Sequence, residues 1–462
     1  MAAGTYVFEV DWNDDGDYLD ANENITAYTK YLSWSRGRDI SSSLTGVSSA
    51  GRLSATLDNS SGLFSPFNTG GALYGSLLPR RKCRVRITAP VAGTLWTGWI
   101  KSIIPQARLH GNHEVILAAT GALGFVADRE IHVAMQTAIL TSAAIDDVLD
   151  DAGWAAADRN LSTGDTTMTR WWADYKSLQA LRDIEAAEAG WLKEDKDGKI
   201  AFENRQFRFL TATSYTAQKT FSDAAGAANP FTAIEEEDPI PFIYNDFRAD
   251  VTAYTVGAEA TLWTHTSSGA NIPMIPAGES RDFWALYPVP DSPTEDIAVN
   301  AWSDVVENTE VIANSQSDGG GSNESGNIVV TESKYATSMK IAVQNNAAIP
   351  VYLTTLYADG TPVKESDPMR AHAEDAASQA AYEKRSWPAP TPFIPNIDEA
   401  QAWCDFHVGV YKDPVPRLSI TYIASRDTTG LTTMAALDLS YRITVDADGN
   451  AGLDIAEDFI IE

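Results

Sequence analysis

The sequence predicts a mainly β protein with a small α/β module, and three observations support this. Short apolar runs separated by Gly, Pro and Asn fill residues 1–130, as in a barrel or a sandwich. Residues 131–205 contain two segments with helical spacing of apolar residues. From residue 206 the β pattern returns, and the stretch 255–365, with a loop at 275–280 and a Gly-containing tip at 318–322, interrupts it like an inserted β domain. We expect four units: 1–130, 131–205, 206–254 with 366–462, and the insertion 255–365.

The β segments are placed by apolar runs that end at turn residues. In the first unit we expect strands at 7–10, 52–57, 84–87, 95–100 and 115–119. Residues 191–194 and 199–202 flank an Asp-Gly turn and predict a hairpin. Residues 351–357 predict a strand of the insertion, and residues 417–422, 441–445 and 458–461 predict the last strands.

Three helices follow from periodicity and capping signals. Ser142 is placed to cap a helix that ends at Gly153, where a left-handed residue is favoured. Its apolar positions follow the i, i+3, i+4, i+7 pattern: Ile145, Val148, Leu149 and Ala152. A second helix is predicted from Ser177 to Gly190. A third is predicted over 397–411, with Asn396 as the cap and Glu399 at its third position: a capping pair.

The charge of the chain is strongly negative and unevenly placed. The net charge is −29, and residues 1–130 contain 12 basic and 12 acidic residues, so the whole excess lies after residue 130. Such a surface repels nucleic acid. Two interpretations stay open: simple solubility, or a non-adhesive lining for a channel through which DNA passes.

Composition also limits the cellular context. Cys83 and Cys404 are the only cysteines, which excludes a disulfide framework and favours a reducing compartment. The N-terminus lacks a basic start followed by an apolar run, so we expect no signal peptide. No apolar run approaches the roughly 20 residues of a membrane span, so we expect no membrane insertion by this chain.

An ordered series of motifs resembles the hub, or "minor tail", proteins at the tip of tailed-phage tails. The N-terminal motifs are 11–17, 34–39, 51–60, 73–79 and 95–100. The later ones are 191–205, 244–246, 375–385, 438–445 and 458–462. Within 375–385, Tyr382 and Arg385 match the family, but Glu383 stands where the family usually has Gly, which puts a tight turn there in question. Many relatives continue past this point, so we expect any downstream receptor-binding or wall-degrading domain to be absent or on another chain.

The resemblance implies a structural virion protein rather than an enzyme. It implies a homotrimer with two tube-protein-like β-barrels per subunit and the insertion, β-sandwich-like, as an external decoration. Three subunits would match a hexameric tail tube above and a threefold tip below, and would line the DNA exit channel. The implied partners are the distal tail ring or tube protein, the tape measure protein, and tip or fibre proteins, with DNA only in transit. The implied location is the virion tail tip, assembled in the host cytoplasm.

The strongest chemical candidate is a turn rich in oxygen ligands. Asp11, Asn13, Asp15 and Asp17 alternate around Gly16, which suits a hard cation such as Ca²⁺. In an EF-hand loop the acid would stand at the twelfth position, but here that position is Asn22 and the acid, Glu23, follows it. A solvated hairpin turn without an ion is the alternative. No other cofactor is expected.

Two further groups of residues are candidate contact sites. Arg80, Arg81 and Lys82 form the one basic cluster and are candidates for contact with an acidic neighbouring subunit; charges that protect an edge strand are the alternative. In the insertion, Trp263 and Trp284 are candidates for stacking on host carbohydrate, although most tryptophans belong to cores.

The chain shows no catalytic constellation. Cys404 and His407 are three residues apart on a predicted helix, but neighbouring aromatics indicate a packed helix face. Neither a metal-binding His motif nor a GxSxG elbow occurs. A structural hub is therefore the first hypothesis, a carbohydrate-binding tail protein the second, and a wall-degrading enzyme the third.

Overall fold

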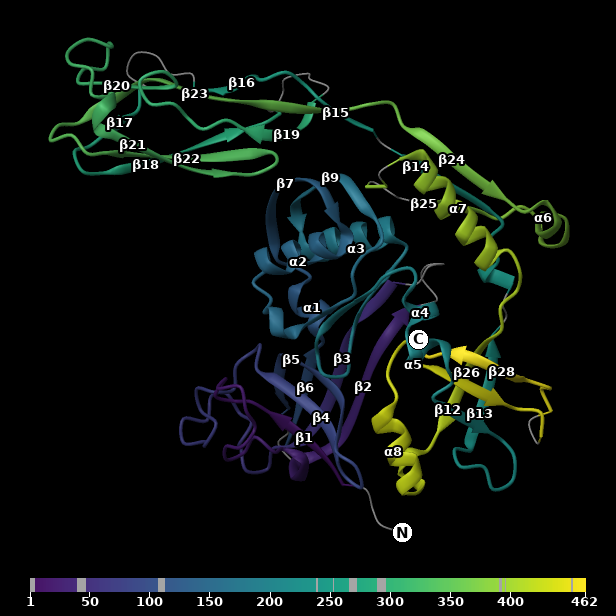
Figure 1. Ribbon diagram of the computed structural model, residues 1–462. Helices are drawn as coiled ribbons and strands as arrows, with labels where there is room; N and C mark the ends of the chain where they lie inside the picture. The colour runs from purple at the N-terminus through teal and green to yellow at the C-terminus, as the bar shows by residue number, and fades with distance from the viewer. Residues whose placement is uncertain are drawn as a thin grey trace.

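The computed structural model is mainly β, as the sequence predicts, with 46% of residues in strands and 20% in helices. It describes residues 5–39, 47–106, 113–237, 240–251, 253–265, 272–288, 296–389, 393–394, 396–449 and 452–462. In Figure 1 an N-terminal sheet lies at the bottom, a helical layer lies above it, the segment 254–365 lies at the top, and the C-terminal strands lie along the right side.

The N-terminal sheet has six antiparallel strands and curves as a half barrel. Its strands are β1 (Thr5–Val10), β2 (Thr29–Asp39), β3 (Val47–Asp58), β4 (Lys82–Ala89), β5 (Gly93–Gln106) and β6 (Glu114–Thr120). Their order is β1-β4-β5-β6-β3-β2, which leaves β1 and β2 as the edges among the described pairings. Alternate side chains point into a core that includes Phe8, Trp96 and Leu117.

The α/β layer above this sheet contains two short sheets and two main helices. Its elements are α1 (Ala122–Val126), β7 (Glu130–Leu140), α2 (Thr141–Asp151), β8 (Arg159–Leu161), β9 (Thr167–Lys176), α3 (Ser177–Glu188), β10 (Trp191–Glu194) and β11 (Ile200–Glu203). β7 pairs with β9, and β10 and β11 form the predicted hairpin, which β8 joins in parallel. Helices α2 and α3 bury Ile145, Leu149 and Leu181 in a common core.

Two helix-end predictions in this layer are wrong. Ser142 is not the cap of α2, because the helix already begins at Thr141 and its first turn has no side-chain cap. The Thr141 hydroxyl instead donates to buried Glu188 at 2.8 Å. Helix α3 ends at Glu188, and Ala189 (φ 54°), not Gly190, is the left-handed residue that follows it. Gly153 (φ 66°) follows α2 in the left-handed conformation that the sequence predicts.

The segment 254–365 is built around one long strand. Its strands are β15 (Tyr254–Val256), β16 (Ala260–Thr264), β17 (Met274–Ile275), β18 (Ser280–Leu286), β19 (Asp296–Trp302), β20 (Val311–Asn314), β21 (Ile328–Lys334), β22 (Ser338–Asn345) and β23 (Val351–Glu365). β23 pairs with β15, β16, β17, β19 and β20, and a second sheet has the order β18-β22-β21. Buried side chains such as Ile341 and Leu353 form one apolar core for both sheets, which is a sandwich arrangement.

The remaining strands come from both sides of that segment. Before it lie α4 (Phe207–Leu210), α5 (Ala212–Tyr215), β12 (Lys219–Ser222), β13 (Phe231–Glu237) and β14 (Asp246–Val251). After it lie β24 (Met369–Glu374), α6 (Ala376–Tyr382), β25 (Ser386–Ala389), α7 (Ile397–Tyr411), β26 (Arg417–Tyr422), α8 (Thr428–Ala436), β27 (Arg442–Asp446) and β28 (Ala456–Ile460). They form three small sheets: β12-β27-β28, β13-β26 and β24-β14-β25.

Helix α7 covers the last of these sheets and follows its prediction closely. The Asn396 side chain accepts from the Glu399 backbone N–H at 2.9 Å, which is the predicted cap. Trp403 and Cys404 pack in one core with Phe247 of β14. None of the helices in the described part of the chain is long and apolar enough to cross a membrane.

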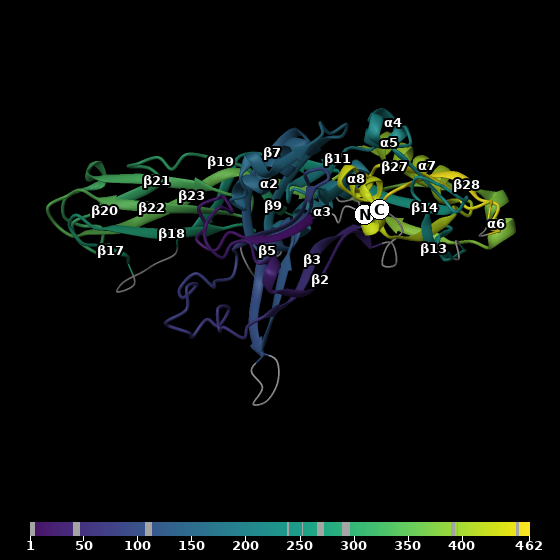
Figure 2. The ribbon, with the colours of Figure 1, turned by 90° about the horizontal axis from the view of Figure 1, so that it is seen from below.

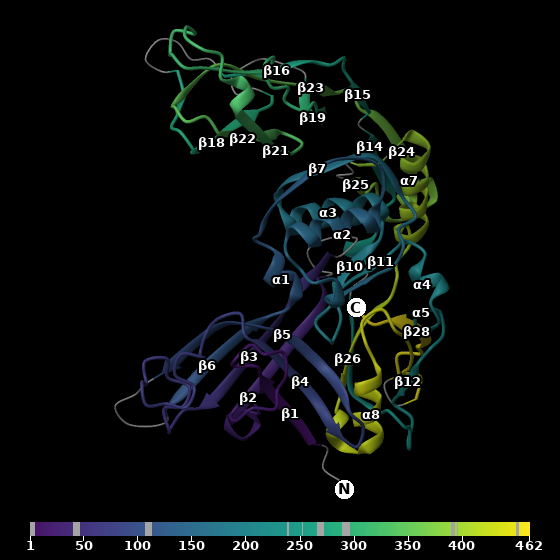
Figure 3. The ribbon, with the colours of Figure 1, turned by 60° about the vertical axis from the view of Figure 1, so that its left-hand side comes forward.

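The C-terminal strands return to the N-terminal sheet, so the two β regions lie side by side (Figure 3). Arg36 of β2 forms an ion pair with Asp438. A Cβ at Gly37 would lie 2.7 Å from the backbone oxygen of Glu462, and the φ of Gly37 is +129°. Glycine is therefore required where the last strand crosses β2.

Candidate functional site

The acidic turn after β1 is organised by one buried carboxylate. Asp11 is 2% exposed. Its side chain accepts the backbone N–H groups of Asp14 at 2.6 Å, Asp15 at 3.2 Å and Gly16 at 3.0 Å. Asp14 and Gly16 have positive φ, which closes the turn around this carboxylate. The side chain that the sequence places first in the ion motif thus also fixes the backbone of the turn.

Two residues of the predicted ion site lie close together, and a third acid, Glu23, lies beside them. Asp11, Asp15 and Glu23 each offer an oxygen within 4.8 Å of the others. Burial raises the pKa of Glu23, although the Asp20 and Trp12 amides donate to its carboxylate. Glu23 stands one position after the expected twelfth residue, and the tight turn at Asn22 (φ 71°) brings it inward.

The other two predicted ligands lie in different surroundings. The Asn13 amide donates to Asp15 at 2.9 Å and to Asp20 at 2.6 Å, so its nitrogen faces the acids. The Asp17 carboxylate accepts the N–H of Leu19 at 2.9 Å. The three-acid group fits the oxygen ligands that Ca²⁺ prefers, whereas Asn13 and Asp17 stabilise the loop.

The basic cluster contacts its own chain. Arg81 forms an ion pair with Asp14 at 2.8 Å. Arg80 lies 5.0 Å from the ring centre of Phe125, and Lys82 lies 5.6 Å from that of Trp99. A contact from these residues to a neighbouring subunit would therefore compete with contacts that each already makes.

The two candidate tryptophans lie in different settings. Trp263 of β16 is partly buried and packs at 5.9 Å against the ring of His265. Trp284 of β18 is 50% exposed, and its ring stacks on Tyr335 with 6.2 Å between centroids and a 16° interplanar angle. Tyr335 was missed at the sequence level, because only the pairing of β21 and β22 brings it to β18.

Cys404 and His407 form a packed helix face, as the sequence predicts. His407 is 3% exposed, and its ring stacks on Trp403 at 3.8 Å. Burial lowers the pKa of His407 to about 4, although the backbone oxygen of Trp403 bonds to its ring nitrogen. Burial raises the pKa of Cys404 to about 11. A neutral imidazole and a protonated thiol in an apolar core do not form a nucleophilic pair at neutral pH.

Two family motifs that are distant in sequence meet at β14. Asn245 is fully buried, and its amide donates to the Glu383 oxygen at 2.9 Å while its own oxygen accepts the Arg385 N–H at 2.9 Å. The neighbouring Asp246 accepts hydrogen bonds from Ser386 and His372, and these bonds lower its pKa to about 2 against the opposing effect of burial. The motif 244–246 therefore holds the turn of the motif 375–385 in place.

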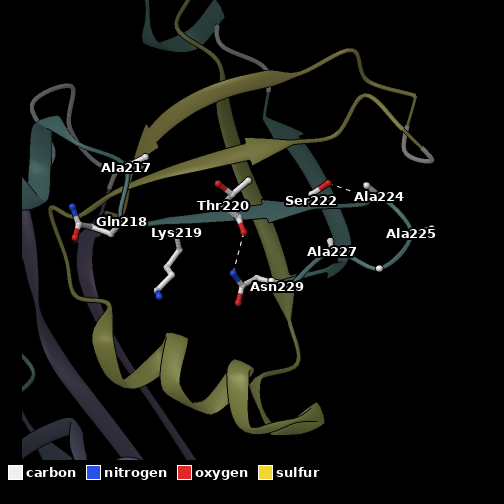
Figure 4. Close-up of a pocket in the computed structure, with 11 residues that line it drawn as sticks. Ala217, Gln218, Lys219, Thr220, Ser222, Ala224, Ala225, Ala227 and Asn229 are labelled. Carbon is white, nitrogen blue, oxygen red and sulfur yellow. Dashed lines mark hydrogen bonds between the residues drawn. The ribbon is translucent and has the colours of Figure 1, made fainter.

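Two cavities lie beside the C-terminal strands. The first, of about 580 Å³, follows residues 217–229, where Asn229 donates to the Thr220 oxygen and Ser222 accepts the N–H of Ala224 (Figure 4). The second is an apolar groove of about 530 Å³ between the N-terminal sheet and α8. Tyr6, Trp34, Ile423, Met434 and Leu437 supply much of its wall.

Comparisons with known proteins gave matches among solved structures. No family model and no curated protein matches the chain. The 43 kDa tail protein of prophage MuSo2 from Shewanella oneidensis is similar at a TM-score of 0.36 and 13% identity, over 54% of this chain and 64% of that one. A tail protein from Neisseria meningitidis MC58 is similar at a TM-score of 0.36 and 12% identity, again over 54% of this chain and 64% of that one. The chain thus spans about 64% of these two proteins' length.

A third similar structure comes from a secretion system. It is the E. coli c3393 protein, described as a component of the type VI secretion system with structural similarity to the T4 bacteriophage tail proteins gp27 and gp5. The TM-score is 0.30 and the identity 8%, over 70% of this chain and 74% of that one.

Proposed function

We propose that this chain is a structural hub at the distal end of a phage tail, a homotrimer that joins the hexameric tail tube to a threefold tip. One observation carries the proposal: the chain forms two β regions that lie side by side. β12, β13 and β14 pair with strands from beyond the insertion, and the second region so formed contacts the first through Arg36 and Asp438. Three subunits of this kind present six β regions, which match sixfold and threefold neighbours.

Each of the four units predicted from the sequence has its own role in the proposed hub. Residues 1–130 and the paired segments 206–254 and 366–462 are the two barrel-like hub domains, with 131–205 as the module between them. Residues 255–365 decorate the outside, since Figure 2 places their strands at the far side of the module from the C-terminal strands. The distal tail ring or tube protein, the tape measure protein and tip or fibre proteins are the proposed neighbours.

The role in this proposal is geometric and not catalytic. The acidic excess after residue 130 would keep DNA from adhering to the channel wall as it leaves. Cys404 and His407, the closest approach to a nucleophilic pair in the sequence, lie in a core and are needed there for packing.

Negative-stain imaging of the purified chain tests the proposal. The hub predicts threefold particles with a central opening that bind rings of tail tube protein. Sixfold rings would point instead to a ring protein higher in the tail. Monomeric particles that fail to bind tube rings would contradict the hub.

A second candidate function is the binding of host carbohydrate, which the exposed pair Trp284 and Tyr335 favours. Stacked exposed aromatic rings offer a flat apolar face to a sugar ring. We expect Trp284→Ala to abolish glycan binding while the melting temperature stays unchanged. Phe209→Ala is the matched control, because Phe209 is 66% exposed but lies outside the insertion. Equal glycan affinity of Trp284→Ala and the unaltered chain would exclude this function.

A further inference from the structure

The acidic turn and the following loop form one protruding lobe, here called the acidic lobe (residues 11–23 and 59–79). Residues 11–23 contain six acidic residues and no Lys or Arg, and residues 59–79 are uncharged. The rings of Trp12 and Phe64 join the two segments, with 6.3 Å between centroids. Each segment carries an exposed apolar side chain, since Leu19 is 87% exposed and Phe67 is 94% exposed.

The loop of the acidic lobe is held in one conformation by its own contacts. Phe64 is fully buried, and its N–H donates to the Asn59 side chain at 2.9 Å. The Asn59 amide donates to Ser65 at 2.9 Å, and the Asn68 amide donates to the Gly62 oxygen at 3.0 Å. Phe67 therefore projects from an ordered loop, so little conformational entropy is lost when a partner covers it.

The apolar groove described above matches the acidic lobe in charge and in apolar surface. The charged side chains in its wall are Arg36, which pairs with Asp438, and Lys196, whose ammonium group donates to the Ala435 oxygen at 2.7 Å and meets no acid there; no acidic residue is among the described residues that line the groove. This is unusual in a chain with a net charge of −29. Ile423 is 52% exposed and Met434 is 39% exposed, so apolar surface remains open to a partner. A segment that combines acidic charge with exposed apolar side chains fits such a groove.

The lobe and the groove lie at opposite ends of the same two strands. Tyr6 near the start of β1 and Ile87 near the end of β4 line the groove. Asp11 follows the end of β1, and the lobe's second segment precedes the start of β4 at Lys82. In Figure 1 the loops of the lobe lie at the left of the sheet and α8 lies at its right. One chain therefore cannot fill its own groove with its own lobe.

We infer that the acidic lobe of one copy docks into the apolar groove of a second copy, with Phe67 as the anchor. The partner is a second copy because the chain itself supplies the acidic element with exposed apolar side chains that the groove requires. A contact between two different surfaces is heterologous, and such contacts close into rings when the rotation allows. The inference rests on the proposed trimer and adds the surfaces through which the trimer closes.

Disulfide trapping tests this contact. We expect the double variant Phe67→Cys with Ile423→Cys to form covalent trimers on oxidation, because each copy is linked to the next around the ring. Native Cys83 and Cys404 are buried and do not interfere. Phe209→Cys with Ile423→Cys is the matched control and should form no trimers. Covalent dimers from Phe67→Cys alone would indicate a twofold contact and would overturn the inference.

A binding measurement separates this inference from the proposed function. We expect Phe67→Ser to weaken self-association at least about tenfold, as the loss of a central aromatic anchor typically does. At a concentration where both chains are monomeric, the melting temperature of Phe67→Ser should equal that of the unaltered chain, because Phe67 is almost fully exposed. If Phe67→Ser forms trimers with unchanged affinity and the cysteine pair forms no covalent trimers, the docking of the lobe is wrong but the proposed hub is not. A chain that is monomeric at every concentration overturns both.

Discussion

Glu383 adopts a backbone conformation that normally belongs to glycine. Its φ is 66° and its ψ is 168°, at the position where the family usually has Gly. The sequence comparison put a tight turn there in question. Glu383 nevertheless adopts this positive φ, because the buried Asn245 side chain binds both the Glu383 oxygen and the Arg385 N–H. Tertiary hydrogen bonds thus impose a conformation that the residue itself disfavours.

The first prediction concerns this strain. Glu383→Gly is expected to raise the free energy of unfolding by roughly 1 kcal/mol, because glycine adopts this φ and ψ without a steric clash. Chemical denaturation measures the change. Glu383→Ala is the control, since it keeps the Cβ and should not share the gain. An equal gain in both variants would mean that the side chain, and not the backbone, is the cause.

Glu194 is a buried carboxylate that joins β10 to the N-terminal sheet. It accepts the N–H of Gly51 at 2.6 Å and that of Ala122 at 3.0 Å. A Cβ at Gly121 would lie 1.5 Å from its Oε2, so glycine is needed for this close approach. Burial raises the pKa of Glu194 to about 7, although these N–H groups lower it.

The second prediction follows from the sign of this shift. Because the folded-state pKa is raised, the folded chain holds the proton more tightly than the unfolded chain. The contribution of Glu194 to stability is thus complete below about pH 4.5 and is lost as the pH rises towards 7, by roughly 3 kcal/mol. We expect Glu194→Gln to lack this contribution, so its stability relative to the unaltered chain should rise between pH 5 and pH 7.5. A difference that stays constant with pH would contradict the assignment.

Among the elements, the turn after β1 was predicted in part. The alternation of oxygen side chains selects Asp11, Asn13, Asp15 and Asp17; Asp11 and Asp15 lie together, but the third acid beside them is Glu23. Glu23 reaches the group because Asn22 adopts a positive φ, which sequence spacing does not reveal. Local patterns specify the residues of a turn better than they specify which side chains converge inside it.

The third prediction concerns an ion in this turn. If Asp11, Asp15 and Glu23 bind Ca²⁺, saturating Ca²⁺ at 100 times its Kd should stabilise the fold by about 2.7 kcal/mol. Titration calorimetry measures the binding of Ca²⁺, and thermal melting measures the stabilisation. Asp15→Asn should weaken binding and leave folding intact, because Asp15 is exposed. Asp58→Asn is the control for charge alone. Unchanged melting with Ca²⁺ would identify the turn as a plain hairpin.

The long strand β23 shows why the sheets of the insertion could not be predicted from the sequence. The sequence predicts a strand over 351–357, but β23 continues through Asp359 and Gly360 to Glu365. Those turn-forming residues stay extended because β16 and β19 pair with this stretch on both sides. Non-local pairing overrides the local signal.

The fourth prediction tests the insertion as a separate unit. Val251 of β14 and Met369 of β24 are paired neighbours, so a short Gly-Ser linker can replace residues 254–365. We expect the shortened chain to fold and to assemble like the full chain. The contacts it loses to the rest of the chain include the hydrogen bonds from Thr337 to Asp174 and from Arg170 to Asn300. They also include the packing of Tyr254 on Trp172 and of Tyr335 on His132. Circular dichroism and sedimentation measure the outcome, and an unfolded product would contradict the division.

At the scale of the whole molecule, the sequence predicted the mainly β class, the α/β layer and most elements. It did not predict the contacts between the two β regions. Arg36, Gly37 and Glu462 meet only because the last strands cross β2, and nothing in their spacing indicates this. The apolar groove is likewise built by β1, β2, β4, β5 and the segment around α8. Surfaces built from segments that are distant in sequence can be identified only from the three-dimensional structure.

The central claim is that three copies of this chain form one hub. Native mass spectrometry at several concentrations tests it most directly. The account predicts a dominant species of about 150 kDa, three times the 50.0 kDa of one chain. A dominant hexamer, or a monomer that persists at every concentration, would contradict it.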